Sequence, residues 1–141
     1  MNEIEFIQEV KLQVKNWVSI KEWIISCVAD ENKTVGCLSY VFMTDEALLV
    51  FNKEYLNHDF YTDVITFDDS DFPMINGDIL VSVDRIKDNS NQLKTNYKEE
   101  FLRVIIHGVL HLCGYKDKVP NDELVMREKE RFYLEKVAFE L

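Results

Sequence analysis

The sequence predicts a single α+β domain spanning residues 1–141, with a mixed sheet of about four strands packed against helices and a buried central helix. Three observations predict this class. The chain has 141 residues, a length typical of one domain. Its composition is 47% hydrophobic with only four glycines and two prolines, which favours a folded core over flexible linkers. Short β-rich segments alternate with helical patterns, and three helical segments follow them.

The first half of the chain contains two predicted strands and two predicted helices. Residues 4–7 alternate weakly and fit a first strand. Apolar side chains recur at helical spacing in residues 16–28, and residues 37–43 are rich in β-formers and fit a buried strand. Thr44 then fits a helix N-cap, because acidic residues follow it, and we expect this helix to run to about Tyr55.

Two further strands are predicted at residues 63–67 and 78–83. A loop without a helix joins them, so we expect them to pair antiparallel. We expect the helices to cover mostly one side of the resulting sheet.

Three helices are predicted in the second half. Residues 84–92 form a short one, and residues 97–113 form the strongest, ended by Gly114 in the expected C′ position. Asn121 or Asp122 is expected to cap the last helix, which would run to about Phe139 and whose residues 127–136 would face solvent.

The N-terminal residues and the cysteines lead us to expect a cytoplasmic location. The first residues lack a basic n-region and a long apolar run, so they do not fit a signal peptide, and no stretch approaches the ~18 apolar residues of a membrane span. Cys27, Cys37 and Cys113 are odd in number and lack CxxC spacing. We therefore expect reduced thiols buried in the core.

The formal net charge is −10, and it is unevenly distributed. Residues 1–84 contain 5 basic and 16 acidic side chains, whereas residues 85–141 contain 11 and 10. Such a balance argues against non-specific nucleic-acid binding, because phosphate affinity comes largely from Lys and Arg. A local basic face in the second half remains compatible with it.

The predicted helix at 97–113 is apolar nearly all round, yet Arg103, His107 and His111 recur every four residues along one stripe. Two imidazoles one turn apart can converge on one metal ion. Gly114 lets the chain leave the helix, and Asp117 then lies six residues after His111 and can return as a third ligand. Asp122 is the rival carboxylate, although it suits a helix N-terminus better.

Two imidazoles and one carboxylate leave a fourth position open, as in catalytic zinc sites, where the metal activates a water molecule. Zn²⁺ is the predicted ion, and Ni, Co or Mn also suits these ligands. The sequence singles out no side chain as general base. Arg103 is predicted to form a buried ion pair, with Glu100 or a carboxylate across the fold, and phosphate binding is its alternative role.

These residues resemble the YbeY family of bacterial endoribonucleases. The stretch HGVLHLCGYKD at residues 107–117 is similar to the family signature HGxLHLxGYDH. Residues 52–67, NKEYLNHDFYTDVITF, resemble the family's NxxYRxKDxPTDVLSF, and residues 77–79 match its GDI. The resemblance implies the family's α+β fold, a zinc ion and a cytoplasmic metal-dependent endoribonuclease acting in ribosomal RNA maturation. Its partners would be RNA and ribosomal proteins.

The chain departs from the family pattern at three informative positions. Asp117 stands where the family has its third histidine, and the resemblance implies that it takes over as metal ligand. Leu56 replaces an arginine that resembles a phosphate-facing group, and His58 replaces a lysine in the same segment. We therefore predict His58, together with Arg103, as substrate-binding residues.

Two other functions remain open. A zinc metalloprotease also uses two histidines at this spacing, but its general base, the Glu after the first His, is Gly108 here. A non-catalytic, metal-stabilised ribosome-associated factor is the second alternative, which the missing arginine and the acidic charge favour.

Overall fold

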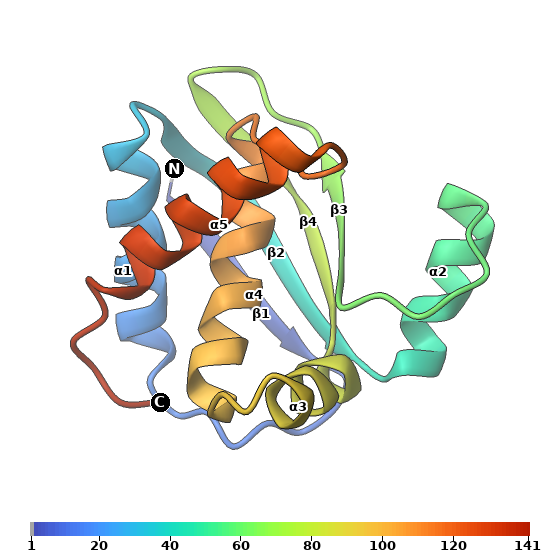
Figure 1. Cartoon of the computed structure of the whole chain (residues 1–141). Coiled ribbons are helices and arrows are strands. Elements are labelled where there is room, and N and C mark those ends of the chain that lie inside the picture. Colours follow the sequence, from blue (N-terminus) through green and yellow to red (C-terminus); the bar gives the residue numbers. More distant parts are fainter. Residues whose placement is uncertain (1) are drawn as a thin grey trace.

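A computed structural model describes residues 2–141 and shows a four-stranded mixed sheet flanked by helices (Figure 1). Among these residues, no helix has the length and apolarity needed to cross a membrane. The elements are β1 (Glu3–Gln8), α1 (Trp17–Asp30), β2 (Thr34–Met43), α2 (Asp45–Leu56), β3 (Val64–Asp68), β4 (Met74–Ser82), α3 (Val83–Gln92), α4 (Tyr97–Leu112) and α5 (Pro120–Leu134).

The strands lie in the order β1-β2-β4-β3. The β1–β2 and β2–β4 pairs are parallel, and β3 runs antiparallel to β4, as their short connection predicts. The parallel pairs require crossovers, and α1 supplies the first of them. The predicted single α+β domain with a mixed four-stranded sheet is therefore confirmed.

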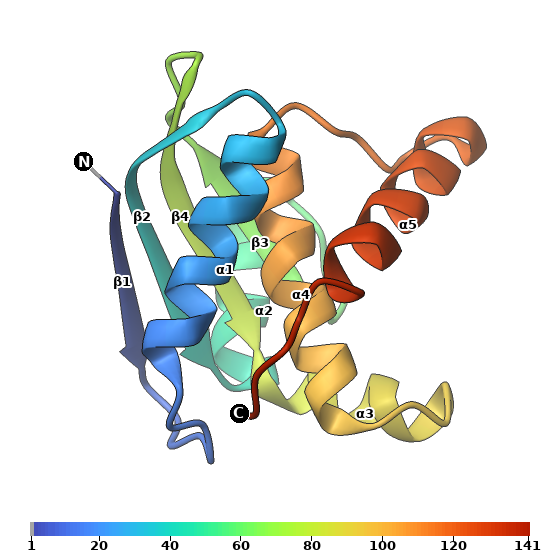
Figure 2. The same cartoon turned by 90° about the vertical axis from the view of Figure 1, so that its left-hand side faces the viewer.

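The main core lies between the sheet and α1 and α4 (Figures 1 and 2). Leu38, Tyr40 and Phe42 alternate along β2 and are fully buried against these helices. The Tyr40 hydroxyl donates a hydrogen bond of 2.9 Å to the carbonyl of Ile105, which fixes α4 on the sheet. Because α4 contacts the sheet on one side and α5 on another, it is the central helix that the sequence predicts.

The opposite face of the sheet is covered less completely. A small cluster joins Met43, Leu48, Ile65 and Leu80, and within it Leu48 belongs to α2. Only Leu48 and Asn52 of α2 are buried, so this helix projects from the domain (Figure 1). The helices thus cover mainly one face, as expected.

The last helix differs from its prediction at both ends. It begins at Pro120, and Val119 occupies the N-cap position without a side-chain hydrogen bond, so the predicted caps Asn121 and Asp122 lie inside the first turn. Proline at the first helical position already has a helical φ, and it has no N–H that would need an acceptor, so this end of the helix has one unpaired donor fewer. The helix ends at Leu134, and the chain beyond it returns to α1, where the carbonyl of Leu141 accepts a hydrogen bond from the Lys15 backbone.

The cysteine prediction is correct for two residues and wrong for the third. Cys27 and Cys113 are buried, whereas Cys37 is exposed. Cys37 precedes the inward-facing Leu38 on β2, so its side chain points to the face that carries fewer helices.

Candidate metal centre

The helix that carries the two histidines has well-defined ends. The Asn96 side chain caps its start by accepting a hydrogen bond of 2.7 Å from the backbone of Glu99. Cys113 is the C-cap, and Gly114 follows with a φ of +111°, a conformation that side-chain-bearing residues rarely adopt. The chain therefore turns sharply after α4, as the sequence predicts.

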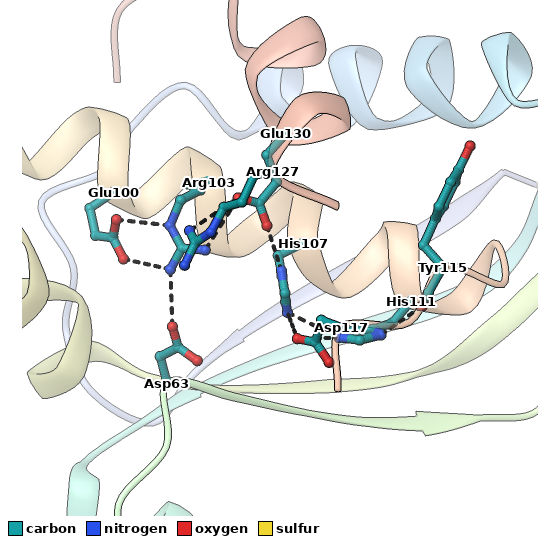
Figure 3. Close-up of polar contacts among 9 residues, drawn as sticks. All are labelled: Asp63, Glu100, Arg103, His107, His111, Tyr115, Asp117, Arg127 and Glu130. Atoms are coloured by element: carbon teal, nitrogen blue, oxygen red, sulfur yellow. Dashed lines mark hydrogen bonds and ion pairs between the residues drawn. The ribbon is translucent and has the colours of Figure 1, made fainter. Parts of the chain in front are cut away.

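His107 and His111 lie one turn apart and direct their Nε2 atoms toward each other (Figure 3). The two Nε2 atoms are 3.0 Å apart, and the side chains are 13% and 24% exposed. Both imidazoles are therefore partly shielded from water but open on one side.

Asp117 completes the cluster from the segment between α4 and α5. Its Oδ2 atom lies 3.3 Å from Nε2 of His107 and 3.4 Å from Nε2 of His111. Tetrahedral ligands about 2.0–2.1 Å from a zinc ion are themselves about 3.3 Å apart. The three side chains thus form a group that can hold a metal ion. The rival Asp122 is not a member of this group.

The outer nitrogen of each imidazole has a hydrogen-bond partner. Nδ1 of His107 lies 2.6 Å from Oε2 of Glu130, and Nδ1 of His111 lies 2.9 Å from the carbonyl oxygen of Tyr115 (Figure 3). A carbonyl can only accept, so His111 carries its proton on Nδ1 and its Nε2 lone pair faces the cluster. Such partners fix the ring orientation and tautomer of metal-binding histidines.

The protonation states also suit a metal site. Burial lowers the pKa of His111, and the neighbouring His107 lowers it further, so the neutral, metal-binding form is favoured. Burial alone would raise the pKa of Glu130, but the hydrogen bond and charge of His107 and the charge of Arg103 lower it. Glu130 is therefore a carboxylate that accepts from His107.

Glu130 is a residue that the sequence interpretation missed. The sequence predicts that residues 127–136 face solvent, yet Glu130 is only 2% exposed. The available signal was its position between Met126 and Tyr133, since these three residues share one face of α5 and all are buried.

Arg103 lies one turn before His107 and is surrounded by carboxylates (Figure 3). It forms a bidentate pair with Glu100, at 2.9 and 2.7 Å, and further contacts at 3.1 Å with Asp63 and 3.5 Å with Glu130. Burial opposes its charge, but the hydrogen bonds and charges of these carboxylates raise the pKa of Arg103. The predicted ion pair with Glu100 is present, and the guanidinium links α4, α5 and the start of β3.

The structure places His58 outside the metal cluster. It lies in the exposed segment after α2, and its ring stacks on Phe60 with a centroid separation of 5.0 Å. Leu56, the last residue of α2, is 43% exposed. The structure leaves the role predicted for His58 in substrate binding untested.

A small cavity of about 180 Å³ borders the cluster, lined by His107, Asp117, Glu123, Met126, Arg127 and Glu130. A larger groove of about 690 Å³ lies between α4 and α5 and shares Arg127 and Glu130 with this cavity. The cavity and the groove are therefore neighbours along α5.

The fold and the cluster define a class: a small α+β protein whose central helix supplies two of the three side chains of a group that could hold a metal ion. The family model described as Endoribonuclease YbeY matches residues 3–138. The chain therefore belongs to the YbeY endoribonuclease family.

Curated relatives named Endoribonuclease YbeY match over most of the chain. The Flavobacterium psychrophilum protein is 46% identical over 127 residues, covering 90% of this chain and 91% of the relative. The Christiangramia forsetii protein is 41% identical over 136 residues, covering 96% and 93%. A solution structure of TM1509 from Thermotoga maritima superposes with a TM-score of 0.68 at 26% identity, covering 94% of this chain and 87% of that one.

Proposed function

We propose that this protein is a metal-dependent endoribonuclease that acts in ribosomal RNA maturation, including processing of the 3′ end of the small-subunit RNA and ribosome quality control. Zn²⁺ is the proposed ion, RNA and ribosomal proteins are the proposed partners, and the cytoplasm is the proposed location. One observation carries the proposal: Nε2 of His107, Nε2 of His111 and Oδ2 of Asp117 lie 3.0 to 3.4 Å from one another. Membership of the YbeY family supports RNA as the substrate.

The chain's own residues have distinct roles in this proposal. His107, His111 and Asp117 would hold the ion, while Glu130 and the carbonyl of Tyr115 orient the two imidazoles. When bound, a divalent ion supplies a Lewis acid and lowers the pKa of a water molecule toward ~7. The cavity beside the cluster leaves room for the scissile phosphate next to His107 and Asp117.

The family pattern has an arginine at position 56, but this chain has Leu56, so other residues must contact the RNA. Arg127 borders both the cavity and the groove, and its side chain is 53% exposed. Arg131 is exposed farther along the same groove. We infer that these two guanidiniums contact the RNA backbone, with His58 as a further predicted contact. Arg103 is already paired with three carboxylates, which favours its structural role.

A metalloprotease is the weaker candidate because position 108 lacks the required carboxylate. Gly108 is buried, and a Cβ built there would lie 2.8 Å from Cγ2 of Ile79, so this position on α4 faces the sheet. A protease base at this position would point away from the metal cluster.

The test is cleavage of an RNA that contains the precursor 3′ end of the small-subunit RNA, by purified metal-loaded protein. We expect cleavage that a chelator abolishes and added Zn²⁺ restores, with His111→Ala inactive. The His58→Ala and Arg127→Ala variants should retain metal and lose RNA affinity. Metal binding without RNA cleavage, but with RNA or ribosome binding, would instead support the non-catalytic factor.

A further inference from the structure

Tyr115 makes two hydrogen bonds that connect the metal cluster to a distant helix. Its carbonyl oxygen accepts from Nδ1 of His111 at 2.9 Å, and its hydroxyl donates to Oε1 of Glu31 at 2.6 Å. Tyr115 also lies between His111 and Asp117 in the chain. Movement of Tyr115 would therefore disturb His111 through the hydrogen bond to its ring nitrogen, and Asp117 through the connecting backbone.

Glu31 is held where three parts of the fold meet. It is the C-cap residue of α1, and its side chain is only 9% exposed. Besides the Tyr115 hydroxyl, it accepts hydrogen bonds from Lys129 at 3.0 Å and from the hydroxyl of Tyr133, both on α5. Glu31 thus joins the end of α1, the ligand-bearing segment and α5.

The Glu31 side chain is a carboxylate at neutral pH. Burial alone would raise its pKa, but hydrogen bonds from Tyr115, Tyr133 and Lys129 lower it below its usual value. An ionised acceptor makes shorter and stronger hydrogen bonds than a neutral one. The hydrogen bond from the Tyr115 hydroxyl to the Glu31 carboxylate is therefore a strong one.

The segment from Gly114 to Val119 needs an anchor. Gly114, Lys116 and Lys118 are exposed, and a glycine restricts the backbone less than any other residue. The Tyr115 ring is packed against the main core, and Lys129 lies over its face at 5.7 Å from the centroid. Tyr115 is thus the residue that ties this segment to the body of the domain.

We propose that Glu31 is a positioning residue for the metal centre: by holding the Tyr115 hydroxyl, it fixes the carbonyl that orients His111 and the segment that presents Asp117. This inference rests on the proposed metal centre but not on RNA cleavage. It assigns a role to the C-cap residue of α1, which is far in sequence from the three proposed ligands.

Two tyrosines provide a matched test, because Tyr115→Phe and Tyr133→Phe each remove one hydroxyl that donates to Glu31. Only Tyr115 belongs to the ligand-bearing segment. We expect Tyr115→Phe and Glu31→Gln to weaken zinc affinity about 10-fold, within the range known for partners of metal ligands. Tyr133→Phe should change the zinc affinity less than about 3-fold, even if it lowers the thermal stability of the protein as much as Tyr115→Phe does. Competition with a chromogenic chelator measures the affinities.

A second measurement in metal-free protein separates positioning from general stability. Nitrogen-15 NMR of the imidazoles reports the tautomer of His111, which should be mainly Nδ1–H in the wild type and in Tyr133→Phe. Tyr115→Phe and Glu31→Gln should shift it toward a mixture. Two results would overturn the proposal. One is a Tyr115→Phe protein with the zinc affinity and the His111 tautomer of the wild type. The other is an equal loss of zinc affinity in Tyr115→Phe and Tyr133→Phe. If the wild-type protein did not bind zinc, the proposed metal centre would be refuted. The His111 tautomer in the variants would still show whether Glu31 positions this imidazole.

Discussion

Glu130 and His107 form a contact of 2.6 Å between α5 and α4, joining Oε2 of the carboxylate to Nδ1 of the imidazole. The other oxygen of Glu130 lies 3.5 Å from a nitrogen of Arg103. The buried carboxylate therefore stabilises α5 against α4 and orients a proposed metal ligand at the same time.

This contact predicts that Glu130→Gln weakens zinc affinity by about 10- to 100-fold, because a neutral amide is a poorer acceptor for the imidazole N–H. Glu128→Gln is the matched control, since Glu128 lies on the same helix and is exposed. Chelator competition on both variants makes the comparison. Equal affinities in the two variants would show that Glu130 has only a structural role.

The third ligand can be tested through the departure from the family. Asp117→Ala should lower zinc affinity by roughly 10- to 100-fold or more, because two histidines alone hold zinc weakly. Asp117→His should restore the affinity by recreating the three-histidine site. Asp122→Ala, in the first turn of α5, should leave it unchanged. A loss in Asp122→Ala with none in Asp117→Ala would mean that the wrong carboxylate has been chosen.

Arg103 should contribute to stability more than to RNA binding. Arg103→Ala leaves the buried Glu100 without its cation and removes one of the two arginines beside Glu130. Breaking a buried pair costs about 3–5 kcal/mol in free energy of unfolding. Arg103→Lys should also destabilise, because an ammonium group cannot replace the bidentate contact with Glu100. Urea unfolding of both variants, with Arg131→Lys as an exposed control, measures the effect. A fully stable Arg103→Lys protein with selectively weakened RNA binding would favour phosphate recognition.

The three cysteines should differ in reactivity. Burial raises the pKa of Cys27 and of Cys113 to about 12, so at pH 8 both remain protonated and shielded. Cys37 is exposed, but its hydrogen bond to Glu3 raises its pKa as well. A thiol-disulfide reagent should therefore modify one thiol in the folded protein, and all three only after unfolding.

The same hydrogen bond predicts the rate at which Cys37 reacts. Glu3→Gln should accelerate the reaction at pH 8, because loss of the carboxylate lowers the thiol pKa and raises the thiolate fraction. Glu5→Gln, two residues along the same strand, is the control and should react at the wild-type rate. Equal rates in both variants would show that Glu3 has no influence on this thiol.

The sequence by itself determined the features that depend on neighbours along the chain. Helical spacing located α4 and brought His107 and His111 to one stripe, and Gly114 marked the turn after them. These features are local, because a helix places residues three or four apart on one side wherever it lies in the fold. The sequence also placed Asp117 in register with the family's third histidine, and the tertiary structure brought its carboxylate to the imidazoles.

Only the tertiary structure decided which groups support those ligands. Glu130 is separated from His107 by 23 residues and Glu31 from Tyr115 by 84, so no periodicity in the sequence connects them. The sequence also wrongly predicts a buried Cys37. Alternation along a strand shows that its two faces differ, but it does not show which face the helices cover. Long-range pairing depends on how α1 and α5 pack around α4, and that packing is set by the whole core rather than by any one segment.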